Sequence, residues 1–140
     1  MNLALPDPLR ARIAAEARSA FPGECCGLLE GTRDGETVRV IAHHPAANLA
    51  KDAAAGFEID PAVQFRLLRT LRGTGRDIVG CYHSHPNGRS GPSETDRARN
   101  RDAEAAFVWL IAAVSGGEVS LAAFQGPDFR PIGMVGRPTA

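Results

Sequence analysis

The chain has 140 residues, of which 44% are hydrophobic and 23% are charged, and its 16 basic and 16 acidic residues cancel. This length fits one compact domain over residues 1–140 with a single core. The balanced charge argues against nucleic acid and membrane surfaces as partners. The N-terminus lacks the basic and apolar segments of an export signal, and we therefore expect a cytoplasmic protein.

The three cysteines, Cys25, Cys26 and Cys81, are an odd number and have no C-x-x-C spacing. This pattern indicates neither a disulfide framework nor a zinc site made of four cysteines. A nucleophilic role for Cys25 or Cys81 would need a basic partner within reach. The pattern therefore favours reduced thiols that act as small buried hydrophobes.

The first part of the chain predicts a helix followed by a strand hairpin. Asp7 is a capping residue before Pro8, apolar residues then recur at helical spacing, and the helix is expected to end near Phe21. The segments Cys25–Gly31 and Thr37–Ala42 are rich in apolar and β-branched residues. We expect them to form the two strands of the hairpin.

The middle of the chain predicts a loop, a helix and a buried strand. Residues 44–56 have no clear period and are expected to be a loop. A helix should begin at Pro61, pack one apolar face on a sheet and end at Gly73. Asp77–His83 predicts a buried strand that runs into the turn-rich residues 86–92. Chemistry is common at such strand ends.

The last part predicts a capped helical segment that begins at Ser93, a second hairpin and a further strand. The apolar runs Phe107–Val114 and Glu118–Phe124 are separated by a glycine-containing turn, which is typical of a hairpin. Residues 127–138 predict a further strand at an edge of the sheet, although their prolines and glycines disfavour a strand.

Two histidines at the end of the buried strand suggest a metal site. His83 and His85 are two residues apart, so both side chains point to the same face of the strand. Catalytic zinc commonly takes three protein ligands and leaves one position for water. Asp96 is the natural third ligand, since it lies in the first turn of the segment that follows the turn-rich loop.

Each of these residues also has an alternative interpretation. His83 or His85 alone could be a polar residue at a strand end. Ser93 and Asp96 could form only a capping box in which Asp replaces the usual Glu. Read together, the three positions favour a metal site. The adjacent residues His43 and His44 point to opposite faces of a strand and are expected to be structural or surface residues.

A zinc hydrolase also needs a general base, and a carboxylate is the usual choice. The residue pattern does not single one out. The candidates are Glu24, Glu30, Asp52, Glu58 and Asp60.

These residues resemble the signature of the JAMM, or MPN-plus, metallopeptidase family, which has an upstream Glu, then H-[ST]-H-P, several residues, and S-x-x-D. The sequence reads HSHP over residues 83–86 and SETD over residues 93–96. Glu24 in GECCGLLEG is similar to the upstream glutamate. The likeness extends over nearly the whole chain and includes FEIDP at residues 57–61.

The resemblance implies a mixed α/β (α+β) fold, in which helices flank a curved, mainly antiparallel mixed sheet, as in the cytidine-deaminase-like JAMM fold. It also implies that His83, His85 and Asp96 bind Zn²⁺. Glu24 would activate the water molecule, and Ser93 would help to stabilise the tetrahedral oxyanion.

Compact bacterial members of the family resemble enzymes that cut after the C-terminal Gly-Gly of small ubiquitin-fold sulfur-carrier proteins. The expected function is therefore a zinc-dependent peptidase or isopeptidase that releases cysteine or another attached amine. A Gly-Gly tail suits a narrow groove because it has no side chains. The alternatives are a catalytically silent binding domain and a peptidase of other short peptides, and the resemblance allows a homodimer.

Overall fold

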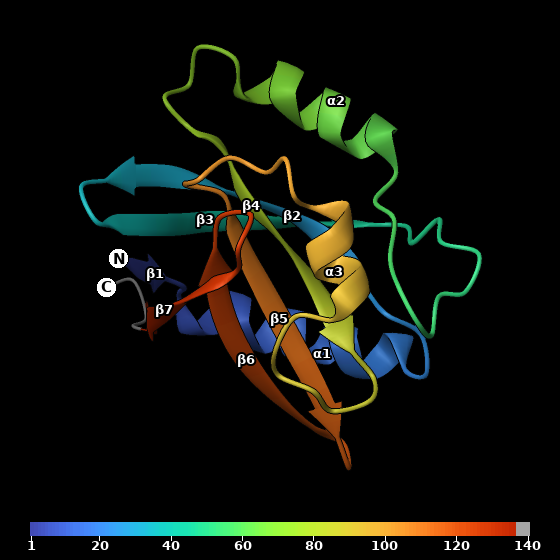
Figure 1. Ribbon diagram of the computed structural model, residues 1–140. Coiled ribbons are helices and arrows are strands. Elements are labelled where there is room, and N and C mark those ends of the chain that lie inside the picture. The colour runs from blue at the N-terminus through green and yellow to red at the C-terminus, as the bar shows by residue number, and fades with distance from the viewer. Residues whose placement is uncertain (137–140) are drawn as a thin grey trace.

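The computed structural model describes residues 1–136 (Figure 1). That part of the chain forms seven strands and three helices. The elements are β1 Asn2–Ala4, α1 Asp7–Ala20, β2 Cys26–Asp34, β3 Thr37–Ala46, α2 Pro61–Leu71, β4 Asp77–His85, α3 Glu94–Arg99, β5 Val108–Ser115, β6 Glu118–Gln125 and β7 Arg130–Val135.

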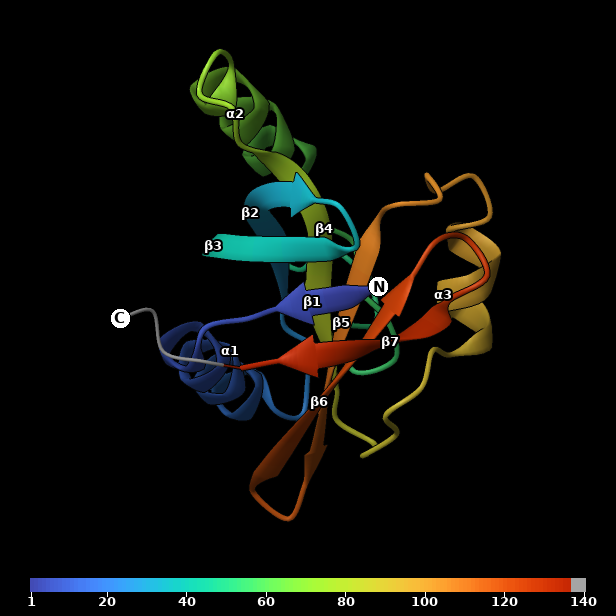
Figure 2. The ribbon, with the colours of Figure 1, turned by 90° about the vertical axis from the view of Figure 1, so that its left-hand side faces the viewer.

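The strands form one strongly curved mixed sheet in the order β1-β3-β2-β4-β5-β6-β7, and the pairing of β7 with β1 closes it into a barrel (Figure 2). The ladders β2–β3, β2–β4, β5–β6 and β6–β7 are antiparallel. The ladders β1–β3, β1–β7 and β4–β5 are parallel. The expected α+β class with a curved, mainly antiparallel mixed sheet is confirmed.

Side chains alternate between two apolar cores, as the period of two in a strand requires. In β5, Val108, Leu110 and Ala112 face the core that α1 helps to build, whereas Trp109 and Ile111 face the core that α2 helps to build. Complete burial of such a side chain stabilises the fold by roughly 1.5–3 kcal/mol. The two helices therefore lie on opposite sides of the sheet (Figure 1).

The register of β2 and β4 brings distant parts of the chain together. The two strands are antiparallel, and Cys26 at the start of β2 lies opposite His83 near the end of β4. Glu24, two residues before Cys26, therefore reaches the end of β4, although it is far from His83 in sequence. This pairing places the candidate site at one end of the central strands.

Both predicted hairpins, the helix at Pro61 and the buried strand are present. β3 continues to Ala46, so the expected loop starts later than residue 44, and α3 is only six residues long. α1 already begins at Asp7, where the side-chain cap expected from this residue is not formed. The short strand β1 has no counterpart among the predicted elements.

The tail strand differs from the expectation because β7 is not at an edge. Arg130–Ile132 pairs with β6, and Gly133–Val135 pairs with β1. Pro131 lies in the half that has no β1 partner, so its missing N–H interrupts no ladder on that side. Residues 137 and 138 of the predicted strand lie outside the described residues.

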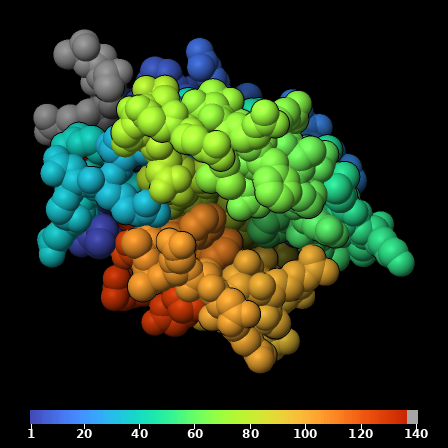
Figure 3. Space-filling view, turned by 90° about the horizontal axis from the view of Figure 1, so that it is seen from above, coloured from blue at the N-terminus to red at the C-terminus, as the bar shows by residue number. Residues whose placement is uncertain are grey.

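None of the helices within residues 1–136 combines the length and the apolar character that are needed to span a membrane. Viewed from above, α2 and the segment that leads into it lie beside the orange residues around α3 and the loop after it (Figure 3). Residues of both segments line a pocket beside the candidate site.

Candidate metal centre

Three ligating atoms converge where β4 ends and α3 begins. His83 Nε2 and His85 Nε2 are 3.1 Å apart. Asp96 Oδ2 lies 3.2 Å from the first nitrogen and 3.1 Å from the second. The three side chains are buried, with exposed fractions of 0%, 4% and 5%. The residues expected to meet therefore do meet, and their binding of a metal stays a prediction.

The turn between β4 and α3 produces this convergence. Gly88 has a φ of +79°, which favours glycine, and its N–H donates to the carbonyl of His85. His85 Nδ1 lies 2.9 Å from the carbonyl oxygen of Arg89. Because only an N–H can bond a carbonyl oxygen, Nδ1 carries the proton and Nε2 keeps its lone pair for a metal.

Ser93 and Asp96 form the capping box that was the alternative interpretation, and Asp96 still reaches the histidines. Ser93 Oγ accepts a hydrogen bond from the Asp96 N–H at 2.9 Å. Asp96 Oδ2 accepts one from the Ser93 N–H at 2.9 Å. The cap thus fixes the carboxylate that points at the two imidazoles, so the two interpretations are compatible.

The donor set fits a zinc ion. Zinc binds imidazole nitrogen and carboxylate oxygen at about 2.0–2.2 Å, so tetrahedral ligands around it are about 3.3 Å apart. The observed triangle has edges of 3.1–3.2 Å. Two imidazoles and one carboxylate are also a ligand set of hydrolytic zinc sites.

Glu24 lies beside this triangle. One carboxylate oxygen of Glu24 and one ring nitrogen each of His83 and His85 lie within 4.8 Å of one another. Glu24 is 8% exposed, and among the described residues its Oε1 has no hydrogen-bond partner. A buried carboxylate oxygen without a partner among the described residues, next to a group that could hold a metal ion, is suited to take a proton from water.

The other carboxylates considered as the base have different surroundings. Each is engaged elsewhere or faces solvent: Glu30 bonds His44 and Arg76, Asp52 and Asp60 accept backbone N–H groups of Ala54 and Ala62, and Glu58 is exposed. Among the five candidates, Glu24 alone belongs to the buried group with the two histidines.

The pKa values of the two carboxylates of the site, Glu24 and Asp96, are shifted in opposite directions. Burial raises the pKa of Glu24 to about 7, while His85 opposes this rise and the Asp96 charge adds to it. Burial also disfavours ionisation of Asp96, but the bonds to His83 and His85 hold its pKa well below its ordinary value. Burial lowers the pKa of His83. Burial also opposes protonation of His85, but the bonds to Asp96 and to the Arg89 carbonyl, together with the charges of Asp96 and Glu24, raise the pKa of His85.

The three cysteines are free and buried. Burial raises the pKa of Cys25 to about 11 and that of Cys26 to about 12, and it also raises the pKa of Cys81. Thiols in this state are not nucleophiles at neutral pH, in agreement with the expectation of small buried hydrophobes.

The expected structural role of the other histidine pair agrees with its contacts. His44 Nε2 lies 2.8 Å from Glu30 Oε1. His43 lies against the ring of Tyr82, and its Nε2 is 3.8 Å from a carboxylate oxygen of Glu16. The two rings therefore point to different neighbours, and neither belongs to the group around His83.

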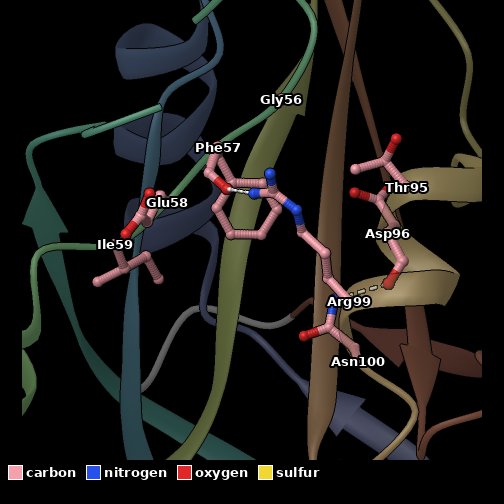
Figure 4. A pocket seen from close by; sticks show the side chains of 8 residues that line it. All are labelled: Gly56, Phe57, Glu58, Ile59, Thr95, Asp96, Arg99 and Asn100. Atoms are coloured by element: carbon pink, nitrogen blue, oxygen red, sulfur yellow. Dashed lines mark hydrogen bonds between the residues drawn. The ribbon is translucent and has the colours of Figure 1, made fainter. Parts of the chain in front are cut away.

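Sequence reasoning missed the side chains that form the wall of the site. The Phe57 ring stacks on the His83 ring, with centroids 4.2 Å apart and planes inclined by 20°. Arg99 Nη1 donates to the Phe57 carbonyl at 3.3 Å (Figure 4). A pocket of about 210 Å³ lies between these segments, lined by Gly56, Phe57, Glu58, Ile59, Thr95, Asp96, Arg99 and Asn100. The FEID sequence at residues 57–60, just before α2, was the feature of the sequence that pointed to this wall.

The chain is similar in sequence to a known family and to several known proteins. The sequence profile of prokaryotic homologs of the JAB domain matches residues 6–125. A desampylase of Haloferax volcanii is 34% identical over 135 residues, which are 94% of this chain and 94% of the relative. A probable TtuB-protein conjugate cleaving protease of Thermus thermophilus is 30% identical over 94% of this chain and 78% of its own. The CysO-cysteine peptidase of Mycobacterium tuberculosis is 29% identical over 69% and 64%.

Solved structures share the fold. A protein of Desulfitobacterium hafniense superimposes with a TM-score of 0.83 at 26% identity, covering 99% of this chain and 94% of that one. A JAB1/MPN domain protein of Archaeoglobus fulgidus superimposes with a TM-score of 0.61 at 16% identity, covering 98% and 99%. The second likeness bears on the fold alone.

Proposed function

Because this chain belongs to the family of prokaryotic homologs of the JAB domain and is a JAMM-type enzyme, we propose that it is a zinc-dependent peptidase of ubiquitin-fold conjugates. Its substrate is the amide bond after the C-terminal Gly-Gly of a small ubiquitin-fold sulfur-carrier protein. The observation that carries the proposal is the buried triangle of His83, His85 and Asp96 beside the unpartnered carboxylate oxygen of Glu24.

His83, His85 and Asp96 would hold the zinc ion through Nε2, Nε2 and Oδ2. When bound, zinc supplies a Lewis acid that lowers the pKa of a water molecule to about 7 and polarises a carbonyl group. The hydrogen bond from His85 Nδ1 to Arg89 and the capping box at Asp96 orient two of the three ligands. The stacked ring of Phe57 keeps water from one face of His83.

Glu24 acts as the general base. It takes one proton from the water molecule that attacks the amide carbon and returns a proton to the leaving nitrogen when the C–N bond breaks. A pKa of about 7 suits both steps, since the group can accept and release a proton near neutral pH. Its buried position beside the two histidines puts the carboxylate within reach of the reacting atoms.

Ser93 stabilises the oxyanion that forms as the amide carbon becomes tetrahedral. Its oxygen accepts the Asp96 N–H, and its own O–H proton stays free to donate. Its side chain is exposed and therefore accessible to a substrate. Loss of one donor to an oxyanion typically costs about 2.7–4 kcal/mol of transition-state stabilisation.

The names of the relatives support the substrate class. One relative is a peptidase of CysO-cysteine and another cleaves TtuB-protein conjugates. The bonds differ in the leaving group, which is an amino acid in one case and a protein in the other. An extended Gly-Gly tail fits a narrow pocket such as the one beside Phe57, because glycine has no side chain to exclude.

A cleavage assay tests the proposal. The zinc-loaded protein is incubated with two carriers, one bearing a C-terminal cysteine and one joined through its last glycine to a lysine side chain. Mass spectrometry should show cleavage after the glycine of at least one carrier, loss of that cleavage with a chelator, and recovery with added zinc. If the loaded protein leaves both carriers intact, the proposed substrate class is wrong.

A further inference from the structure

Glu24 lies just before the ladder of β2, which begins at Cys26, so other contacts must fix its backbone. The Glu24 N–H donates to the carbonyl of Ala53 at 2.6 Å. The Glu24 carbonyl accepts a hydrogen bond from Asn48 Nδ2 at 3.0 Å. Two of the contacts that fix Glu24 therefore come from the loop between β3 and α2.

The side chain of Asn48 organises this loop. Its Nδ2 also donates to the Gly56 carbonyl at 3.0 Å. Its Oδ1 accepts the N–H groups of Ala50 and Glu58, both at 3.0 Å. Two donated and two accepted bonds use the full capacity of an amide side chain. Because the donors face carbonyls and the acceptor faces N–H groups, only one orientation of the amide satisfies all four bonds.

The same side chain also controls the wall of the site. Gly56 and Glu58, which Asn48 holds, are the two neighbours of Phe57 (Figure 4). Phe57 places its ring on His83 at a centroid distance of 4.2 Å. One amide thus links the backbone of the general base with the residue that packs on a metal ligand.

We propose that Asn48 is a positioning residue of the reaction. Through the carbonyl of Glu24 it sets the carboxylate of that residue against His83 and His85, and through Gly56 and Glu58 it sets Phe57. The inference rests on the proposed function, since Asn48 acts through Glu24. A residue that only stabilised the loop would lower the stability of the protein without a selective loss of turnover.

The variant Asn48→Asp removes the two hydrogen bonds that the Asn48 side chain donates and keeps the two that it accepts. The variant has the same shape, and its carboxylate can still accept the N–H groups of Ala50 and Glu58. It cannot donate to the carbonyls of Glu24 and Gly56, and it faces them with negative charge instead. Asp52→Ala is the matched control, because Asp52 lies in the same loop and, within residues 1–136, its side chain only accepts the local bond from the Ala54 N–H at 3.2 Å.

Steady-state kinetics, zinc content and amide hydrogen exchange are measured on both variants. In Asn48→Asp we expect kcat to fall about 100-fold, as a small misplacement of a catalytic group does, with KM and zinc content near the wild-type values. Exchange of the Glu24 amide should become about tenfold faster, because the bonds that hold this segment are lost. Asp52→Ala should match the wild type in all of these measurements.

Unchanged kcat and unchanged exchange at Glu24 in Asn48→Asp would overturn the inference, and so would a parallel loss of zinc and turnover. If this variant does not fold, Asn48→Ser replaces it, since its single hydroxyl can donate to only one of the two carbonyls, and the same outcomes apply. If the wild-type protein cleaves no carrier, the proposed function fails. The exchange comparison then still decides whether Asn48 holds Glu24.

Discussion

At the scale of single residues, two buried carboxylates beside the same pair of histidines have opposite protonation preferences. Within residues 1–136, one carboxylate oxygen of Glu24 has no hydrogen-bond partner, and burial raises the pKa of Glu24 to about 7. Asp96 is as deeply buried, but the bonds to His83 and His85 keep it ionised. The difference in partners, and not in burial, suits one carboxylate to proton transfer and the other to metal binding.

The raised pKa of Glu24 predicts a pH dependence of stability in the metal-free protein. The folded state has a pKa of about 7 and the unfolded chain one near 4.5, so the folded state binds more protons between these values. The contribution of Glu24 to stability is thus full below pH 4.5 and is lost as the pH rises to 7, by on the order of 2–3 kcal/mol.

Urea unfolding of the chelated wild type and of Glu24→Gln across this pH range measures the effect. The variant lacks the titration, so its stability relative to the wild type should increase as the pH rises. Parallel stability curves would show that the pKa of Glu24 is not raised in the folded state.

Glu24→Gln also tests the role of the base. The amide keeps the size of the side chain but cannot take a proton, so kcat should fall by roughly 10²–10⁴-fold while zinc content stays at the wild-type level. Kinetics at measured zinc occupancy check this. Turnover at the wild-type rate would refute the assignment of Glu24 as the base.

His83→Ala and Asp96→Ala should lose the metal. Each removes one of three ligating atoms, so zinc affinity should fall by more than the roughly 10–100-fold that outer hydrogen-bond partners of a ligand usually cost. Competition with a chelating dye measures the affinity. His44→Ala is the control, because His44 bonds Glu30 away from the site and its loss should leave zinc bound. Equal affinity in all variants would exclude this ligand set.

At the scale of elements, the stability of α3 depends on the hydrogen bonds at its first turn. It has only six residues, which is too short for a helix to be stable by itself, and the capping box of Ser93 and Asp96 satisfies two backbone N–H groups at its start. The same two residues carry proposed chemical roles. Their contributions to the helix and to the reaction therefore have to be separated by experiment.

The variant Ser93→Asp separates the contribution of Ser93 to the stability of α3 from its contribution to the reaction. Aspartate is a good capping residue, so the loss of stability should be well below the approximately 1 kcal/mol expected for Ser93→Ala. An ionised carboxylate cannot donate to an oxyanion, so kcat should fall about 10²–10³-fold. Ser93→Thr, which keeps both functions, should retain turnover and stability. Melting curves and kcat of the three variants check this, and full turnover in Ser93→Asp would remove Ser93 from the mechanism.

At the scale of the whole molecule, a three-residue strand closes the barrel. β1 lies between β3 and β7, and its central residue, Leu3, is fully buried in the core on the α1 side. The closure leaves the sheet without the open edges that favour aggregation. The candidate site lies at β2 and β4 and not at β1. Closure of the barrel therefore stabilises the fold without contributing residues to the site.

Leu3→Ala should therefore destabilise the protein by about 2–5 kcal/mol, the usual cost of removing a buried leucine side chain. At a temperature where the variant is folded, zinc affinity and kcat should be close to the wild-type values. Leu68→Ala is the control, because Leu68 is 41% exposed and its truncation should change stability little. Urea unfolding measures both, and a loss below 1 kcal/mol in Leu3→Ala would contradict a structural role of β1.

Much of the fold could be predicted because its signals are local. Apolar spacing and Pro61 mark α2, and the alternation and turn residues around Gly116 mark the β5–β6 hairpin. The tail was expected to add an edge strand, and its prolines and glycines gave only a weak strand pattern. Its pairing with β1 depends on barrel closure, which is a property of the whole chain, and β1 itself is too short to show a period.

The sequence by itself determined most of the elements, the turn after β4 and the residue types at the three proposed ligands, since HSHP and SETD lie close together in the chain. Only the tertiary structure decided which of five carboxylates lies beside the histidines, because the register of β2 against β4 brings Glu24 there. The roles of Asn48 and Phe57 likewise follow from contacts between segments distant in sequence, and such contacts have no local signature.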